Sequence, residues 1–373
     1  MTFSCASYDF SSAIDVVSRA LAAKPVKESY GYIMIDATDD SCVSVSCTDG
    51  IIYMMANIEQ AHVDECGIIC LDGKLLSEIV RKQSGDEITL TSNGKNCTIK
   101  SGKAKTQMAL RPANDFPSAP TVSDKSKTVK LPQGELRACI DYVEFCTSHD
   151  ESRKILTGVL LELSKGQFCT VGLDGFRMAL RKAACDYDGE ETRIVIPKGS
   201  AVEISRLLKD GEKEPITLSM GKEYLHVWVG RYAVSTVLLS GEYIDYHKLI
   251  REECGTKALL DARQLRGSVE RAQIMARNGQ KAMIFMRFNE NTLTVTSSAI
   301  DGDTEEEMDV GLQGKPLTIA FNPAYMLDML KREPDGQLDM ECQGNVSPAI
   351  IRPLDQQDRL QLVLPVRILG GAA

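Results

Sequence analysis

The sequence lacks any apolar run close to the roughly 20 residues that a membrane-spanning helix needs. It also lacks an opening basic stretch followed by an apolar one, which is the pattern of a secretory leader. Hydrophobic residues make up 43% of the 373 positions and charged residues 25%, proportions that are ordinary for a globular chain with two or three cores. We therefore expect a soluble, cytoplasmic protein.

Metal-binding and catalytic patterns are also missing. The twelve cysteines and four histidines are scattered without the paired spacing of a zinc site. Buried, reduced thiols are the usual state of cysteines in a chain of this size. The sequence contains no phosphate-binding Gly-x-x-x-x-Gly-Lys loop, no His-Glu-x-x-His and no nucleophile elbow. We expect no metal, no cofactor and no enzymatic activity.

Three segments that break at an Asp-Gly pair recur at nearly equal intervals, at Asp49, Asp174 and Asp301. Glycine tolerates positive φ and aspartate bonds to its own backbone, so each pair suits a turn between strands. The interval is close to a third of the chain, which predicts three copies of one domain. We expect these domains to span residues 1–121, 128–246 and 247–373.

Each copy has the same expected order of elements, a helix, strands, a second helix and further strands. Apolar residues at three- to four-residue spacing predict the helices, and alternating apolar residues predict the strands. The expected helices span residues 10–23, 73–83, 133–147, 197–209, 262–277 and 323–332. Ser11 or Ser12 is expected to cap the first of them. Six helices and about two dozen short strands give an α+β fold.

The middle turn is followed by Phe176, Arg177 and Met178 and is preceded by a strand-like run at residues 155–161. Together these two runs resemble the second domain of the bacterial DNA sliding clamp, the beta subunit of the replicative polymerase. The closure Asp-Phe-Pro at residues 115–117 resembles the end of that family's first domain. The resemblance extends along the whole chain. It implies three DNA-clamp domains whose helices line a central hole and whose antiparallel sheets lie outside.

The resemblance further implies a processivity factor, a head-to-tail homodimer that encircles double-stranded DNA without reading its sequence. The implied protein partners are the replicative polymerase, the clamp loader, repair polymerases and other proteins that carry a clamp-binding motif.

The charge distribution fits such a ring. The net charge of −9 argues against a protein that coats nucleic acid through its overall charge. The expected helices, however, carry an excess of positive charge, and the rest of the chain carries an excess of negative charge. Ordinary solvated helix faces explain the same excess without DNA. The helices of two copies, spaced about 10 Å apart, would enclose a hole about 28 Å wide, which accommodates a duplex. By the resemblance, the candidates for DNA contact are Lys24, Lys74, Arg81, His149, Arg153 and Lys198.

A hydrophobic cleft for short peptides is also implied by the resemblance, between the second and third domains. The family's cleft positions fall here on Leu156, Leu173, Gly175, Phe176, Arg177, Met178, Ile244, Leu249, Leu362, Leu364, Pro365, Val366 and Arg367. Apolar strand ends are equally typical of a core, so both interpretations stay open. Leu173, Phe176 and Ile244 replace the family's usual threonine, histidine and proline, which predicts a more apolar pocket. Residues 369–373 run past the family's usual end.

The contact between two subunits is implied to join Ile274 and Met275, near a helix end, to Thr106 and Met108 on a first-domain strand. Thr106 stands where the family commonly has a large apolar residue, which predicts weaker ring closure.

Two other functions remain open. One is a three-domain scaffold that binds peptides without DNA, and retention that depends on DNA topology would discriminate it. The other is a small-molecule hydrolase or transferase that uses Asp174 and Arg177. A turn aspartate beside an arginine is structurally ordinary, and the missing catalytic motifs argue against that reading.

Overall fold

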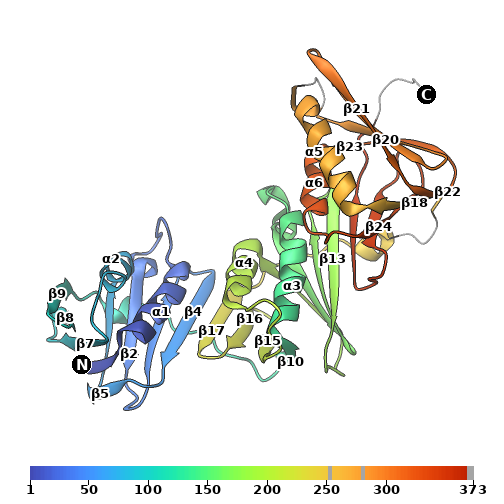
Figure 1. Cartoon of the computed structure of the whole chain (residues 1–373). Helices are drawn as coiled ribbons and strands as arrows, with labels where there is room; N and C mark the ends of the chain where they lie inside the picture. Colours follow the sequence, from blue (N-terminus) through green and yellow to red (C-terminus); the bar gives the residue numbers. More distant parts are fainter. Residues whose placement is uncertain (251–253, 279–281, 368–373) are drawn as a thin grey trace. The chain divides into compact units, whose positions relative to one another are not determined.

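A computed structural model describes residues 1–250, 254–278 and 282–367 (Figure 1). These residues divide into two compact units. Unit 1 comprises Met1–Arg137 and Cys185–Leu238, and unit 2 comprises Ala138–Ala184 and Leu239–Ala373. The helix α3 (Gln133–Val143) contains the boundary between them.

Unit 1 contains the helices α1 (Ser7–Val17), α2 (Gly73–Val80) and α4 (Lys198–Leu207). Its strands are β1 (Thr2–Ala6), β2 (Tyr32–Ala37), β3 (Val43–Thr48), β4 (Ile52–Ile58), β5 (His62–Glu65), β6 (Gly67–Asp72), β7 (Glu87–Ser92), β8 (Asn96–Ser101), β9 (Ala104–Ala109), β10 (Lys127–Pro132), β14 (Thr192–Pro197), β15 (Pro215–Met220), β16 (Tyr224–Val229) and β17 (Tyr232–Val237). One sheet has eight strands in the order β10-β15-β16-β17-β4-β3-β2-β6, and another has five in the order β5-β1-β7-β8-β9. The helices α1 and α2 pack together over these sheets (Figure 1).

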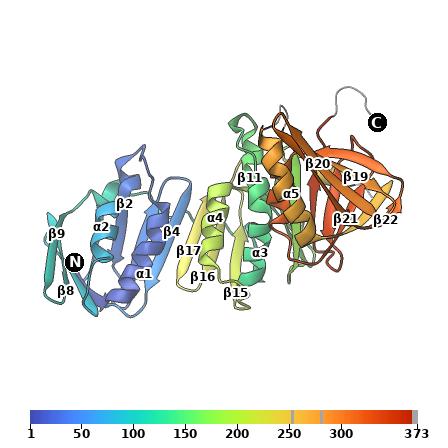
Figure 2. The same ribbon diagram turned by 45° about the horizontal axis from the view of Figure 1, so that its top comes forward.

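Unit 2 contains the helices α5 (Ala262–Asn278) and α6 (Pro323–Leu330). Its strands are β11 (Gly158–Ser164), β12 (Gln167–Leu173), β13 (Arg177–Ala184), β18 (Thr256–Asp261), β19 (Ile284–Asn289), β20 (Thr292–Ala299), β21 (Gly302–Asp309), β22 (Gly311–Gly314), β23 (Leu317–Phe321), β24 (Gln337–Cys342), β25 (Ala349–Pro353) and β26 (Arg359–Val363). A long sheet runs through β11-β12-β13-β26-β25-β24-β18-β22, and a four-stranded sheet has the order β21-β20-β19-β23. The helix α5 packs on β20 (Figure 2) and against α6 (Figure 1).

Two antiparallel strand pairs join segments from different sequence repeats. In unit 1, β17 pairs with β4 from Tyr232↔Ala56 to Thr236↔Ile52. In unit 2, β13 pairs with β26 from Arg177↔Val363 to Arg181↔Arg359. Each pair therefore makes one sheet out of two repeats. One part of the middle repeat joins the first repeat through β17, and another part joins the third repeat through β13. This pairing explains why the two compact units do not coincide with three sequence repeats.

The predicted helices are present; α2, α3, α4 and α6 end two to four residues earlier than expected, and the first helix differs at both ends. It begins at Ser7, so Ser11 and Ser12 lie inside it, and the expected cap is wrong. Ala6 occupies the N-cap position without a side-chain cap. The helix ends at Val17 and continues only as a short 3-10 turn, Ser18–Ala20. The burial of Phe10, Ala13, Ile14 and Val17 sets the helix in place, because tertiary packing outweighs a missing cap.

The first two Asp-Gly pairs form the turns that the sequence predicts. Asp49 Oδ1 accepts hydrogen bonds from the backbone N–H groups of Ile51 and Ile52, and the next glycine has φ +89°. Asp174 makes the same arrangement one repeat later. The third copy is tighter, because Ala299 pairs directly with Gly302 in the β20–β21 hairpin.

Candidate peptide and DNA interfaces

The turn between β12 and β13 is fixed by its own side chains. Asp174 Oδ1 accepts hydrogen bonds from the backbone N–H groups of Phe176, at 2.8 Å, and Arg177, at 2.9 Å. Gly175 has φ +93°, and a Cβ there would lie 3.3 Å from the guanidinium of Arg153. A side chain at this position would therefore be strained and crowded. The turn presents Phe176 to solvent, with 54% of its surface exposed.

Phe176 lies at the centre of a surface cluster, which we call the aromatic patch and define as Phe176, Tyr325 and Leu364. The ring of Phe176 stacks on that of Tyr325, with centroids 5.7 Å apart and planes 27° apart. The backbone N–H of Leu364 donates to the carbonyl oxygen of Phe176 at 2.8 Å. Leu364 is 38% exposed. Three elements that are distant in sequence, the β12–β13 turn, α6 and the end of β26, therefore meet at one exposed apolar surface.

Close in sequence to the β12–β13 turn and to the end of β26, three of the predicted cleft residues lie side by side on neighbouring strands. Leu173 pairs with Met178, and Met178 pairs with Leu362. All three are buried, with 3% or less of their surface exposed, and Leu156 is buried as well. These four residues belong to the hydrophobic interior. They can support a binding surface from below but contribute little contact area to it.

The other predicted cleft residues lie nearer the surface. Gly175, Ile244 and Arg367 are exposed, and Leu249, Pro365 and Val366 are half-buried. The backbone N–H of Val366 donates to the carbonyl oxygen of Ala320 on β23, which holds the segment after β26 beside that strand. The predicted tail at residues 369–373 lies outside the described residues.

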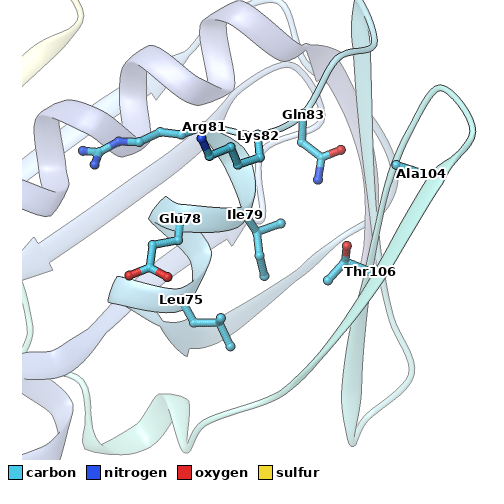
Figure 3. A pocket seen from close by; sticks show the side chains of 8 residues that line it. All are labelled: Leu75, Glu78, Ile79, Arg81, Lys82, Gln83, Ala104 and Thr106. Carbon is cyan, nitrogen blue, oxygen red and sulfur yellow. The ribbon is translucent and has the colours of Figure 1, made fainter.

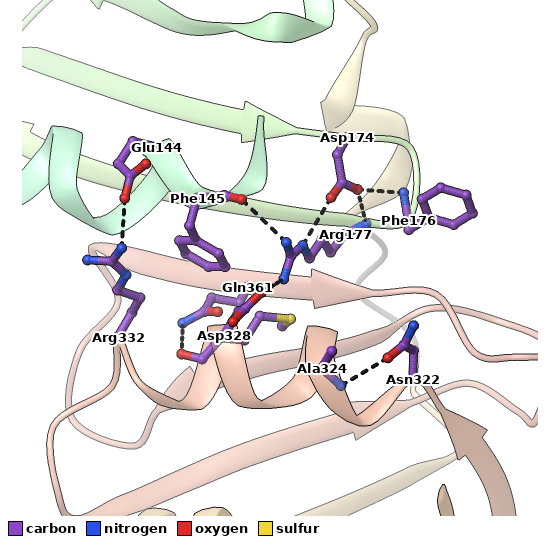
Figure 4. A network of polar contacts seen from close by, with 11 residues as sticks. Glu144, Phe145, Asp174, Phe176, Arg177, Asn322, Ala324, Asp328, Arg332 and Gln361 are labelled. Atoms are coloured by element: carbon purple, nitrogen blue, oxygen red, sulfur yellow. Dashed lines mark hydrogen bonds and ion pairs between the residues drawn. The ribbon is translucent and has the colours of Figure 1, made fainter. Parts of the chain in front are cut away.

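The guanidinium of Arg177 is surrounded by hydrogen-bond acceptors and aromatic rings, a set of contacts that we call the Arg177 cage (Figure 4). Its Nε donates to Asp174 Oδ2 at 3.0 Å and its Nη1 to Asp328 Oδ2 at 2.7 Å. Its Nη2 donates to the carbonyl oxygen of Phe145 at 3.4 Å. The guanidinium also lies over the ring of Tyr325, 4.6 Å from its centroid. Burial opposes the charge, but the hydrogen bonds to Asp328 and Asp174 raise the pKa of Arg177 above its usual value.

Sequence reasoning missed Tyr325, Asp328 and Phe145. Asp328 is 151 residues from Arg177, and no local pattern connects the two. The available signal was the spacing of Tyr325 and Asp328, which puts both on one face of the predicted helix.

The predicted DNA-contact residues are accessible in both units. Lys24, Lys74 and Arg81 are exposed, and Lys198 is half-buried at the first position of α4. Arg81 makes an ion pair with Asp15 at 2.8 Å. In unit 2, His149 and Arg153 are exposed, and Arg153 lies 3.5 Å from Asp150. Neighbouring carboxylates therefore offset part of the charge of both arginines.

At the predicted subunit contact, unit 1 has a hollow of about 800 Å³ between α2 and β9 (Figure 3). Its lining residues are Leu75, Glu78, Ile79, Arg81, Lys82, Gln83, Ala104 and Thr106. Thr106 is half-buried, while Met108 is 3% exposed and belongs to the interior. In unit 2, Ile274 on α5 is 60% exposed and Met275 is half-buried. Each unit thus presents apolar surface where the subunit contact is expected.

The structure describes no helix long and apolar enough to cross a membrane. Among its described residues, no three His, Cys, Asp or Glu side chains gather in a way that could hold a metal ion.

Solved structures share this fold along nearly the whole chain. A DNA polymerase sliding clamp from Bacillus subtilis matches with a TM-score of 0.94 and 26% identity, covering 99% of each chain. A sliding clamp from Pseudomonas aeruginosa, solved bound to griselimycin, matches with a TM-score of 0.92 and 22% identity over 99% of this chain and 100% of that one. The fold is that of a DNA clamp.

Family models agree with this fold in chain order. The N-terminal, central and C-terminal domains of the DNA polymerase III beta subunit match residues 1–120, 130–245 and 247–367. The chain belongs to this family, the bacterial DNA sliding clamps, which are processivity factors of replication. The beta sliding clamp of Vibrio cholerae is 24% identical over 94% of this chain and 96% of its own length. That of Staphylococcus aureus is 27% identical over 82% of this chain and 81% of its own.

Proposed function

We propose that two copies of this chain close into a ring around duplex DNA and tether the replicative polymerase to it through the aromatic patch. The observation that carries the tethering role is the exposed Phe176–Tyr325 stack beside Leu364. Exposed aromatic and aliphatic side chains of this kind are typical anchors for a peptide. The clamp loader, repair polymerases and other clamp-binding proteins would use the same surface. We assign the three clamp domains to residues 1–121, 128–246 and 247–373.

The ring would hold DNA by enclosure. Lys24, Lys74 and Lys198 offer a few positive charges, and phosphate contacts carry no sequence information. The net charge of −9 on the whole chain disfavours wrapping of the duplex around the protein surface. Such a protein slides, acts without catalysis and works in the cytoplasm, where bacterial DNA is replicated.

Complementary sheet edges support a head-to-tail dimer. β9 ends one sheet of unit 1, and Lys105 on it lies opposite Lys100 of β8. Like charges directly opposite each other destabilise a pair of strands, so an acidic partner would relieve this repulsion. β21 ends the four-stranded sheet of unit 2 and exposes the acidic residues Asp303, Glu305, Glu307 and Asp309. Pairing β9 of one copy with β21 of the other would bring Lys105 close to these acidic residues.

The same contact would place Ile274 of one copy near the hollow between α2 and β9 of the other. Such an interface uses two different surfaces of the chain and closes by a two-fold rotation of the whole ring.

A topology experiment tests this proposal. Protein loaded onto nicked circular DNA by the clamp loader should remain bound through gel filtration and be released when a restriction enzyme linearises the circle. Retention on the cut DNA, or loss from the intact circle, would contradict enclosure.

A further inference from the structure

We propose that Arg177 is a positioning residue: its ion pair with Asp328 holds Tyr325 against Phe176, and the stacked rings then contact the peptide. This inference rests on the proposed peptide-binding function. It reassigns Arg177, which the family resemblance places among the residues that line the cleft.

Hydrogen bonds and burial together limit the capacity of Arg177 to bind a ligand. Its three bonds, to Asp174, Asp328 and the Phe145 carbonyl, occupy three of its five N–H groups, one on each nitrogen. Only 10% of its side chain is exposed. A guanidinium fixed by bonds in three directions cannot rotate, so the position of its flat face is determined.

That flat face supports Tyr325. The centre of the guanidinium is 4.6 Å from the Tyr325 ring centroid, within the range of a cation–π contact. Tyr325 and Asp328 lie three residues apart on α6, so they share one helix face. Arg177 therefore holds the helix through Asp328 and the ring through stacking. Phe176, the next residue in the chain, stacks on the same ring.

Arg177 also contacts a second aromatic ring, that of Phe145. The guanidinium of Arg177 lies 5.3 Å from the Phe145 ring centroid, and the guanidinium of Arg332 lies at the same distance from that ring. Arg332 also bonds to Glu144 at 2.7 Å. The aromatic pair is thus supported from α6 and from the turn after α3, and Arg177, at the start of β13, contacts both.

A lysine cannot replace this arrangement. Its ammonium is a compact point charge without a flat face, so it can bond to Asp328 or Asp174 but cannot also support a ring. Arg177→Lys should keep the charge at this position and lose the alignment of Tyr325.

Calorimetric titration with griselimycin, the compound bound to the Pseudomonas aeruginosa clamp, tests the inference. Arg177→Lys and Asp328→Asn should each weaken binding by about tenfold, the scale of coupling between residues in direct contact. Asp328 is 45% exposed, so its substitution should leave the fold intact. Asp328→Glu, which retains the charge, should recover part of the affinity.

A double-mutant cycle separates positioning from a general structural role. With Tyr325→Ala in the background, Arg177→Lys should change the affinity by less than about twofold, although its effect on the melting temperature persists. An equal loss of affinity in both backgrounds would overturn the inference. So would unchanged affinity in both Arg177→Lys and Asp328→Asn.

Two further variants control the experiment. Arg181→Lys alters a neighbouring β13 arginine that pairs with Asp358 and should bind as the wild type does. Phe176→Asp tests the proposed function itself. If Phe176→Asp binds normally, the patch is not the binding surface; if it abolishes binding while the Arg177 and Asp328 variants do not weaken it, only the positioning role fails.

Discussion

The hydroxyl of Tyr142 on α3 donates a hydrogen bond to the carboxylate of Glu333, which follows α6. The same oxygen of Glu333 accepts a bond from Gln361 Nε2 at 2.5 Å. The Glu333 side chain is fully enclosed, and Arg359 Nε lies 4.0 Å from its second oxygen. Burial raises the pKa of Glu333, and the bonds from Tyr142 and Gln361 and the nearby Arg359 and Arg181 only partly offset this effect.

A raised carboxyl pKa predicts how stability depends on pH. In the unfolded chain a glutamate loses its proton near pH 4.3, whereas Glu333 in the folded protein keeps it to higher pH. Over that interval the unfolded state binds fewer protons, so the contribution of Glu333 to stability falls as pH rises. Glu333→Gln stays neutral at every pH. The difference in melting temperature, variant minus wild type, should therefore increase as the pH is raised from about 4 to about 7. Calorimetric melting curves that keep a constant separation across this range would refute the prediction.

The aromatic patch predicts a division between binding and stability. Phe176→Ala or Leu364→Ala should weaken binding of a polymerase-derived peptide by about 1.5–3 kcal/mol, the free energy of burying one large apolar side chain. The melting temperature should change little, because both residues are exposed. Met178→Ala should instead destabilise the fold by about 2–5 kcal/mol, because Met178 is completely buried.

Calorimetry and thermal melts check both parts. Val346→Ala, at a 69% exposed position in unit 2, is the matched control and should alter neither quantity. Wild-type affinity in the Phe176→Ala and Leu364→Ala double variant would show that the peptide binds elsewhere.

The subunit contact predicts opposite effects at two positions. Ile274→Asp should shift the protein to monomer, because a charge would be buried against the hollow beside β9. Thr106→Leu should lower the dimer dissociation constant, because a larger apolar side chain fills part of that hollow. Light scattering across a dilution series measures both changes, with Val346→Asp as a control at an exposed loop position. A wild type that remained monomeric at tens of micromolar would argue against the dimer.

The basic residues predict weak, salt-sensitive contact with DNA. Reversing Lys74, Arg81 and Lys198 to glutamate should reduce direct binding and loading. The logarithm of the binding constant should also fall less steeply with the logarithm of salt concentration, by the slope of about three phosphate contacts. Rings that are loaded should still slide, because enclosure retains them. Lys222→Glu, in the β15–β16 turn, is the control and should load normally. Tight, salt-resistant binding of the wild type to short linear duplex would contradict this model.

The helices were the most predictable part of the fold. Residues 262–277 were expected to be helical, and α5 spans Ala262–Asn278, because Leu265, Val269, Ala272 and Ala276 form a continuous buried stripe. The first helix was misplaced at its start because no capping side chain marks it. Its position follows from packing, which a local pattern does not encode.

The candidate site was predictable only in part. The family resemblance predicted Phe176 and Leu364 as cleft residues, and the structure brings these two residues together. It could not separate Met178, which is buried, from Phe176, which is exposed, because a strand end supplies both kinds of position. The Arg177–Asp328 pair depends on a tertiary contact between β13 and α6, and no periodicity in the sequence records such a contact.

Because β4 and β17 belong to one sheet, the covalent linker between the first two repeats is not what holds them together. Five consecutive residue pairs join these strands, from Tyr232↔Ala56 to Thr236↔Ile52. The linker at residues 121–125 is exposed and suits protease cleavage. A single cut there would leave two fragments that still migrate as one particle under native conditions and separate only in denaturant.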